Sequence, residues 1–231
     1  MSGEEWEKWI ADPASALRDD EAAGRLKKAE SAVRPGMRNS VRIVAGARRS
    51  RRLRVPQGLT VRPTSEMVRE AIFNSLGPIT GMAVLDLFAG TGAMGLEALS
   101  RGAEACVFVE QDRRVAEVLR QNIRDLDYEA ESRVVVADYA AALQDIRRSG
   151  RRFDLLFIDP PYKMLPEAEV TLEPLIPPVM HAGGVAVLES ERGSHPSLGA
   201  VPVFDRVYGD TRVTMVVIGG EAQSSGPERE D

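Results

Sequence analysis

The chain has one cysteine, two histidines and few aromatic residues, and these scarcities exclude several kinds of protein. A single cysteine, Cys106, cannot form an intrachain disulfide, which excludes a disulfide-stapled fold and fits a reducing cytosol. Cys106 lies inside a predicted strand, so we expect a small buried apolar residue there and not a nucleophile. His181 and His195 lack the spacing of metal ligands, so we expect surface positions for both and no metal site.

Long apolar runs are also missing. No stretch reaches the roughly 18 apolar residues of a membrane span. Residues 1–5 are acidic and lack the basic and apolar regions of a signal peptide. A chain of 231 residues with 43% hydrophobic content suits one domain with an appendage. We therefore expect a cytoplasmic protein that does not enter a membrane.

Charge is unevenly distributed along the chain. The net charge is −5, yet positions 38–69 contain nine arginines and one acid, a balance of +8 that leaves −13 for the remainder. Guanidinium forks pair with phosphate oxygens, so such a block favours a nucleic-acid partner over a merely solvated basic surface. The candidate RNA-binding residues within the block are Arg48, Arg49, Arg51, Arg52, Arg54, Arg62 and Arg69.

The chain divides into four predicted parts. Residues 1–37 mix acids, bases and alanines and predict a flexible extension. Residues 38–60 predict a basic arm, in which strands 41–45 and 53–55 form a β-hairpin with arginines 48, 49, 51 and 52 at its tip. We predict that residues 61–220 form the main domain and that residues 221–231 form a disordered acidic tail.

The main domain begins with a predicted helix. Its proposed N-cap is Thr64, its apolar face includes Val68 and Ile72, and Gly77 with Pro78 ends it. Strands are then predicted at 82–88, 106–110, 134–138, 153–159 and 185–189. Helices are predicted between them at 93–101 and 112–125, as a short helix that ends at 149, and at 167–181. Strands 204–208 and 212–218 leave no room for a helix between them. This order predicts an α/β Rossmann-like fold, a mostly parallel seven-stranded sheet with a closing antiparallel hairpin.

A glycine-containing turn follows the first predicted strand. Glycines there allow close backbone approach to a ligand at the carboxyl edge of the sheet. The candidate cofactor-binding residues of this turn are Asp86, Phe88, Ala89, Gly90, Thr91 and Gly92. Glu110 ends the second strand, where an acid binds ribose hydroxyls, and Asp138 ends the third, in position for an adenine amine. Each acid alone is equally well explained as a helix cap, and a nicotinamide dehydrogenase shares the turn.

The tetrapeptide Asp159-Pro160-Pro161-Tyr162 follows the apolar strand 153–158. The prolines stiffen the backbone, so that the carboxylate of Asp159 and the carbonyl of Pro160 can accept the two hydrogens of a planar amine. Tyr162 can stack on an extracted base. We therefore predict chemistry on the exocyclic nitrogen of a nucleobase, with residues 159–162 as the catalytic residues. The alternative is that Pro-Pro only ends the strand.

Together these motifs resemble a known family. Asp86-x-Phe88-x-Gly90-x-Gly92 combined with the tetrapeptide 159–162 resembles the S-adenosylmethionine-dependent amino-methyltransferases of class I. Segments 42–56, 62–64, 68–74, 96–102 and 208–211 are similar to the RsmD group of ribosomal RNA guanine-N2 methyltransferases, and the likeness covers about residues 41–218. It implies S-adenosylmethionine as the cofactor. It further implies a guanine N2 in the helix 31 loop of 16S rRNA as the target, in the 30S subunit or an assembly intermediate.

Two parts of the sequence depart from this resemblance. Many relatives have an acid-arginine pair before Val68, whereas Glu66-Met67 stands here, so no role is carried over to Met67. Residues 1–36 lie outside the likeness, as a lineage-specific tail or a misassigned start.

Other functions stay open from the sequence. A DNA adenine-N6 methyltransferase uses the same tetrapeptide, and a protein glutamine methyltransferase has Asn where Asp159 stands. An RNA-binding ribosome assembly factor is the alternative outside the enzymes. Nothing in the chain demands a dimer, so we expect a monomer.

Overall fold

The computed structural model describes residues 41–56 and 65–219. The predicted extension, the acidic tail, Arg62 and Thr64 lie outside the described residues. No helix within the described ranges is long and apolar enough to cross a membrane.

Seven strands form one sheet in the order β3-β2-β1-β4-β5-β7-β6. Strands β1 to β5 are parallel, and β7 runs antiparallel between β5 and β6. This confirms the predicted mostly parallel sheet with its closing hairpin. The strands are β1 (Ala83–Asp86), β2 (Ala105–Val109), β3 (Ser132–Val135), β4 (Phe153–Ile158), β5 (Met180–Glu191), β6 (Pro202–Tyr208) and β7 (Thr211–Ile218).

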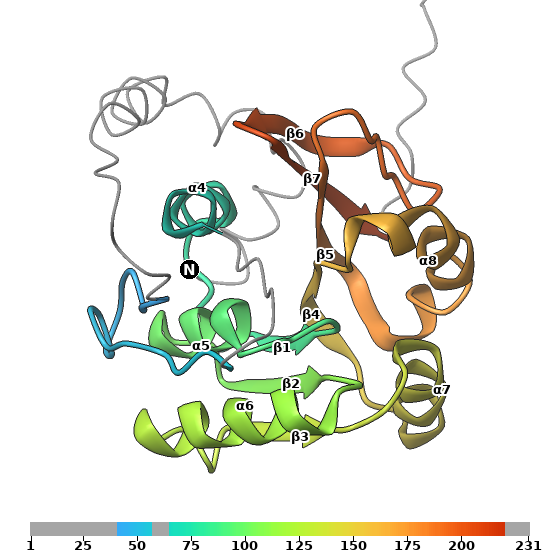
Figure 1. Cartoon of the computed structure of the whole chain (residues 1–231). Coiled ribbons are helices and arrows are strands. Elements are labelled where there is room, and N and C mark those ends of the chain that lie inside the picture. The colour runs from blue at the N-terminus through green and yellow to red at the C-terminus, as the bar shows by residue number, and fades with distance from the viewer. Residues whose placement is uncertain (1–40, 57–64, 220–231) are drawn as a thin grey trace, which may run out of the picture.

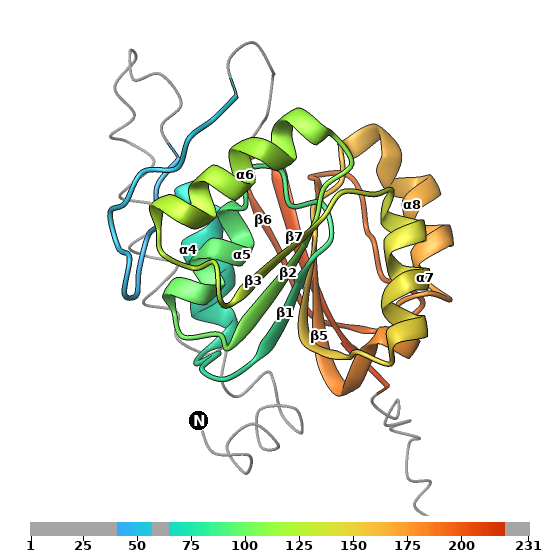
Figure 2. The same ribbon diagram turned by 90° about the horizontal axis from the view of Figure 1, so that it is seen from below.

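Helices cover both faces of the sheet. In Figures 1 and 2, α4, α5 and α6 lie on one face, while α7 and α8 lie on the other. The helices are α4 (Glu66–Leu76), α5 (Ala93–Ser100), α6 (Arg113–Asp125), α7 (Tyr139–Ser149) and α8 (Leu165–Leu172), with short 3-10 turns η1 (Tyr162–Met164) and η2 (Pro177–Val179). The strand order switches between β1 and β4: β2 and β3 follow on one side of β1, and β4 and β5 lie on its other side. Such a switch point leaves a crevice at the carboxyl ends of the strands.

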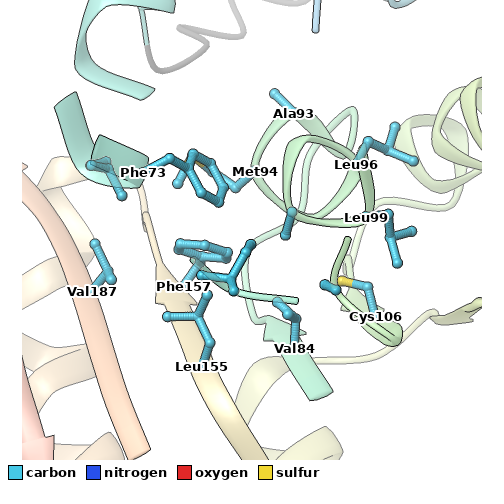
Figure 3. Close-up of a cluster of buried hydrophobic side chains, with 14 of the residues drawn as sticks. Phe73, Val84, Ala93, Met94, Leu96, Leu99, Cys106, Leu155, Phe157 and Val187 are labelled. Atoms are coloured by element: carbon cyan, nitrogen blue, oxygen red, sulfur yellow. The ribbon is translucent and has the colours of Figure 1, made fainter. Parts of the chain in front are cut away.

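Each face of the sheet has its own apolar core. Phe73 of α4 packs edge-on against Phe157 of β4, with ring centroids 5.6 Å apart, and Val187 of β5 lies beside them (Figure 3). Cys106 is buried in the same cluster, as expected for a small apolar residue. His181 and His195 are exposed, which confirms their predicted surface positions.

The predicted helix 167–181 is wrong in its second half. Helix α8 ends at Leu172 because Pro174 cannot donate the hydrogen bond that continuation requires, and Pro177 and Pro178 form η2 instead. Strand β5 then begins at Met180, and its pairing with β4 shifts register between Phe153 and Leu155. Strand β5 is therefore longer than predicted.

The N-cap of helix α4 lies one residue later than predicted. The hydroxyl of Ser65 accepts a hydrogen bond from the amide of Val68 at 3.2 Å, so Ser65 and not Thr64 is the N-cap. Gly77 ends the helix as predicted.

The basic segment, residues 41–56, is a docked hairpin and not a projecting arm. Its two limbs share a single β-bridge, Arg42 with Arg52, so the predicted strands are not formed. Val41, Ile43 and Leu53 are buried in the core cluster under α4 and α5, which places this segment within the main domain.

Polar groups of α5 hold the basic segment in place. The carboxylate of Glu97, fully buried, accepts from the amides of Val44 and Ala45 at 2.7 and 2.9 Å. The hydroxyl of Ser100 donates to the carbonyl of Ala45 at 2.6 Å. Gly46 closes the turn with φ +82°, and a Cβ there would lie 1.8 Å from the carbonyl oxygen of Ser100. Only glycine fits at this position.

Several arginines of the basic segment bind the end of α6. The Arg48 Nε donates to the Leu126 carbonyl at 2.7 Å, and its guanidinium lies 5.3 Å from the centre of the Tyr128 ring. Arg51 donates to the Asp125 carbonyl, and Arg54 forms an ion pair with the Asp125 carboxylate at 2.7 Å. Cations are stabilised there by the negative end of the helix dipole. These arginines therefore fasten the basic segment to the domain.

Candidate functional site

A cavity of about 500 Å³ lies at the carboxyl ends of the central strands. It brings together the glycine turn after β1, Glu110 after β2 and the tetrapeptide after β4. Of the sequence-predicted residues, it is lined by Asp86, Phe88, Ala89, Gly90, Thr91, Glu110, Asp159, Pro160, Pro161 and Tyr162. Gly92 and Asp138 are absent from this lining.

Glu110 connects the glycine turn to the start of α6. Its Oε2 accepts from the Gly90 amide at 2.9 Å, and its Oε1 accepts from the Asp112 amide at 2.8 Å. Gly90 has φ +53°, and an added Cβ would meet no atom within 4 Å. The turn therefore presents backbone to open space inside the cavity, as the predicted ligand contact requires.

Gly92 serves packing instead. It has φ +87° at the start of α5, and a Cβ there would lie 2.4 Å from the Leu119 side chain of α6. This close helix contact explains the glycine, and the predicted ligand contact at Gly92 finds no support in its position.

Asp86 has a strongly raised pKa. The side chain is buried, and its Oδ2 accepts from the Gly95 amide of α5 at 2.9 Å. Burial raises the pKa of Asp86 to about 7, since the single backbone hydrogen bond only partly offsets desolvation and the negative charge of Glu110 adds to the shift. Asp86 therefore supports the turn and also offers the cavity a carboxyl group close to its titration point.

Asp138 caps a helix. Its Oδ1 accepts from the amides of Ala140 and Ala141 at 2.9 and 3.3 Å, and strand β3 ends three residues earlier, at Val135. The exposed Asp138 is flanked by Ala137 and Tyr139, both of which line the cavity. Its contact with an adenine amine stays a prediction.

An aromatic pair forms one wall that the sequence analysis missed in part. Phe88 of the glycine turn and Tyr139 of α7 have ring centroids 5.2 Å apart, and both line the cavity. Such a wall suits the face of a planar ring. The sequence feature that could have indicated Tyr139 was its position directly after Asp138, at the predicted end of a strand.

The tetrapeptide 159–162 follows the end of β4 and lines the same cavity as the aromatic pair. Tyr162 begins the 3-10 turn η1, and its hydroxyl is 3.2 Å from the Thr211 hydroxyl at the start of β7. The closing hairpin thus holds the tyrosine that the tetrapeptide supplies.

Glu189 is the acid that the sequence analysis did not single out. It lies near the end of β5, is 8% exposed, and lines the same cavity as residues 159–162. The one available signal was its position at a predicted strand end, shared with Glu110.

The seven predicted RNA-binding arginines have different environments. Arg69 of α4 is 1% exposed and donates to the Arg42 carbonyl at 2.6 Å, so its guanidinium cannot reach a phosphate on the surface, and we withdraw it from that group. Burial lowers the pKa of Arg69, while the carboxylates of Glu97, Glu66 and Glu189 oppose this shift. Arg49 and Arg52 are exposed. Within the described residues, neither guanidinium forms a side-chain hydrogen bond or ion pair. Arg62 lies outside the described residues.

Fold and cavity together define a Rossmann-like methyltransferase of the S-adenosylmethionine-dependent class. The profile of the family described as "Conserved hypothetical protein 95" matches residues 41–217. The chain therefore belongs to that family, the RsmD group.

Named relatives agree with this assignment. The chain is 39% identical to "Putative rRNA methyltransferase YlbH" of Bacillus subtilis over 53% of its own length and 67% of the relative's. It is 40% identical to "Ribosomal RNA small subunit methyltransferase D" of Escherichia coli, over 53% of its length and 61% of that protein's. The solved "Putative methyltransferase yhhF from Escherichia coli" superposes with a TM-score of 0.66 at 32% identity, covering 78% of this chain and 98% of that one.

Proposed function

We propose that this protein transfers a methyl group from S-adenosylmethionine to the exocyclic N2 of a guanine in 16S rRNA of the small ribosomal subunit, in the helix 31 loop. The observation that carries this proposal is the single cavity that joins the glycine turn to the tetrapeptide 159–162. Relatives named as small-subunit rRNA methyltransferases support the substrate class.

The cavity fits the charge and shape of the cofactor. S-adenosylmethionine carries a sulfonium and an ammonium group, and four carboxyl groups line the cavity: Asp86, Glu110, Asp159 and Glu189. Glu110 would accept from the ribose hydroxyls, since each of its oxygens keeps a further lone pair. The ring pair Phe88 and Tyr139 would hold the adenine. Asp86 would face the amino acid end.

The tetrapeptide would orient the target amine. Asp159 and the Pro160 carbonyl accept the two N2 hydrogens, which draws the nitrogen lone pair out of the ring and stabilises the positive charge that develops on nitrogen. Tyr162, held by Thr211, stacks on the base. The cofactor would supply an electrophilic methyl group, with sulfur keeping the electron pair of the broken S–C bond, and the proton lost from N2 would pass to water.

The basic segment would bind the RNA backbone. Arg49 and Arg52 are exposed beside arginines that already fasten the segment to α6, so a rigid cationic surface results. Arg48, Arg51 and Arg54 would add their charge to this surface. Arg62, outside the described residues, stays a predicted RNA-binding residue. We place the protein in the cytoplasm as a monomer acting on the 30S subunit or an assembly intermediate.

Labelled S-adenosylmethionine and small subunits from a strain that lacks the gene test this proposal. We expect label on a guanine N2 with the wild type. Asp159→Ala should lower methyl transfer by at least roughly 100-fold while RNA binding is kept. Asp145→Ala, an exposed acid on α7, is the matched control and should transfer normally.

Each alternative predicts a different outcome. Normal transfer by Asp159→Ala would show that the site is assigned wrongly. Label in DNA adenine would favour the DNA methyltransferase, which shares the tetrapeptide. RNA binding by the wild type without any label would favour the assembly factor.

A further inference from the structure

Glu189 has no part in the chemistry described so far, although it lies in the cavity. A carboxylate that is 8% exposed is costly to bury, and the fold retains it beside the catalytic tetrapeptide. Its role therefore needs an explanation.

Strand register places Glu189 next to Asp159. Strands β4 and β5 are parallel neighbours, and their last pair is Ile158 with Leu188; continuing this register by one residue sets Asp159 beside Glu189. Neighbouring strands lie about 4.8 Å apart. Side chains alternate between faces, and Phe157 and Val187, two residues earlier, share the core under α4 and α5 (Figure 3). Asp159 and Glu189 thus open onto the same side of the cavity.

A buried cation offsets the negative charge of Glu189. Arg69 lies on α4 one turn before Phe73, which packs on Phe157, and Glu189 is among the carboxylates that act on its guanidinium. The guanidinium also donates to the Arg42 carbonyl at 2.6 Å. A charge balanced in this way can stay buried as an acceptor. Arg69 is a positioning residue in this arrangement.

Guanine and adenine differ at the ring nitrogen beside the amine. In guanine, N1 carries a hydrogen and adjoins the N2 amine, so this edge consists of donors. In adenine, N1 is an acceptor. A carboxylate next to the amine clamp therefore accepts a hydrogen bond from N1 of guanine. It repels adenine, because two acceptors, the carboxylate oxygen and N1, would face each other.

We propose that Glu189 selects guanine by accepting the N1 hydrogen while Asp159 and the Pro160 carbonyl hold the N2 amine. This inference rests on the proposed function. It assigns the choice between guanine and adenine, which residues 159–162 leave open, to the neighbouring strand.

The test uses RNA with 2-aminopurine at the methylated position, in whichever form of RNA or subunit the wild type methylates. This base keeps the N2 amine but has an acceptor at N1. We expect the wild type to prefer guanine by at least roughly 100-fold in kcat/KM. In Glu189→Gln the preference for guanine should fall at least tenfold, because the amide can donate a hydrogen bond to an unprotonated N1. A tenfold change is about the discrimination that one hydrogen bond provides.

A merely structural role would not change this ratio between the two bases. Glu104→Gln, an exposed acid near the amino end of β2, is the matched control and should keep the wild-type ratio. An unchanged ratio in Glu189→Gln would overturn the inference. So would a wild type that methylates both RNAs equally, a result that needs no variant. A wild type inactive on guanine N2 would instead overturn the proposed function.

Discussion

At the scale of single residues, Asp86 shows how burial tunes the site. Its pKa of about 7 means that the folded protein without ligand binds a proton that the unfolded chain, with a pKa of 3.8, releases. The free energy of unfolding therefore decreases as pH rises from about 4 to about 7, by up to about 4 kcal/mol. A cationic ligand reverses the preference, since it favours the carboxylate.

We predict that S-adenosylmethionine binding to the wild type strengthens between about pH 5.5 and pH 7 and releases a proton, because the charged ligand lowers the Asp86 pKa. Asp86→Asn should bind more weakly and lose most of this pH dependence. Isothermal titration calorimetry in buffers of different ionisation enthalpy measures both effects. An affinity that does not change with pH in the wild type would contradict the assignment.

The same scale separates glycines that look alike in sequence. Gly90 and Gly92 both occur in the turn after β1, yet Gly90 faces the cavity while Gly92 packs on Leu119. Spacing alone predicted a ligand role for both. The distinction depends on where α6 crosses, a contact between segments far apart in the chain.

At the scale of elements, one side chain of α6 links the basic segment to the glycine turn. Asn122 of α6 accepts from the Arg54 amide at 2.7 Å and donates to the Thr91 carbonyl at 2.9 Å. The hairpin and the glycine turn thus share one side chain. A sequence pattern cannot reveal this, because Asn122 sits within an ordinary helix.

We predict that Gly46→Ala destabilises the protein by at least roughly 2 kcal/mol, because the added Cβ meets the Ser100 carbonyl and the left-handed φ is unfavourable. Gly81→Ala is the matched control: it has φ +80° but no atom within 4 Å of the added Cβ. It should cost only about 1 kcal/mol. Urea unfolding measures both, and equal losses would show that the docking of residues 41–56 contributes little.

At the scale of the whole molecule, the basic segment and the cavity carry charges of opposite sign. Arg49 and Arg52 are exposed on a segment in which Arg48, Arg51 and Arg54 bind the end of α6, while acids line the cavity. Under the proposed function, the cationic surface attracts the RNA backbone, and the acidic cavity suits a cationic cofactor and the donor edge of a base.

We predict that Arg49→Ala/Arg52→Ala weakens RNA binding and reduces the slope of log affinity against log salt by about 1.4, the value for two contacts to single-stranded RNA. Arg151→Ala/Arg152→Ala removes the same charge from the exposed loop before β4, which lies outside the basic segment and the cavity. Filter binding over a range of salt concentrations compares them. Equal slopes for the two variants would place the RNA elsewhere.

The sequence by itself determined the order of strands and helices, the closing hairpin, the glycine turn and the tetrapeptide, because periodicity, glycine and proline act locally. Tertiary structure decided the rest. It buried Arg69, docked the predicted arm through Glu97 and brought Glu189 into the same cavity as Asp159. These outcomes depend on register and on packing between distant segments, which no local pattern specifies.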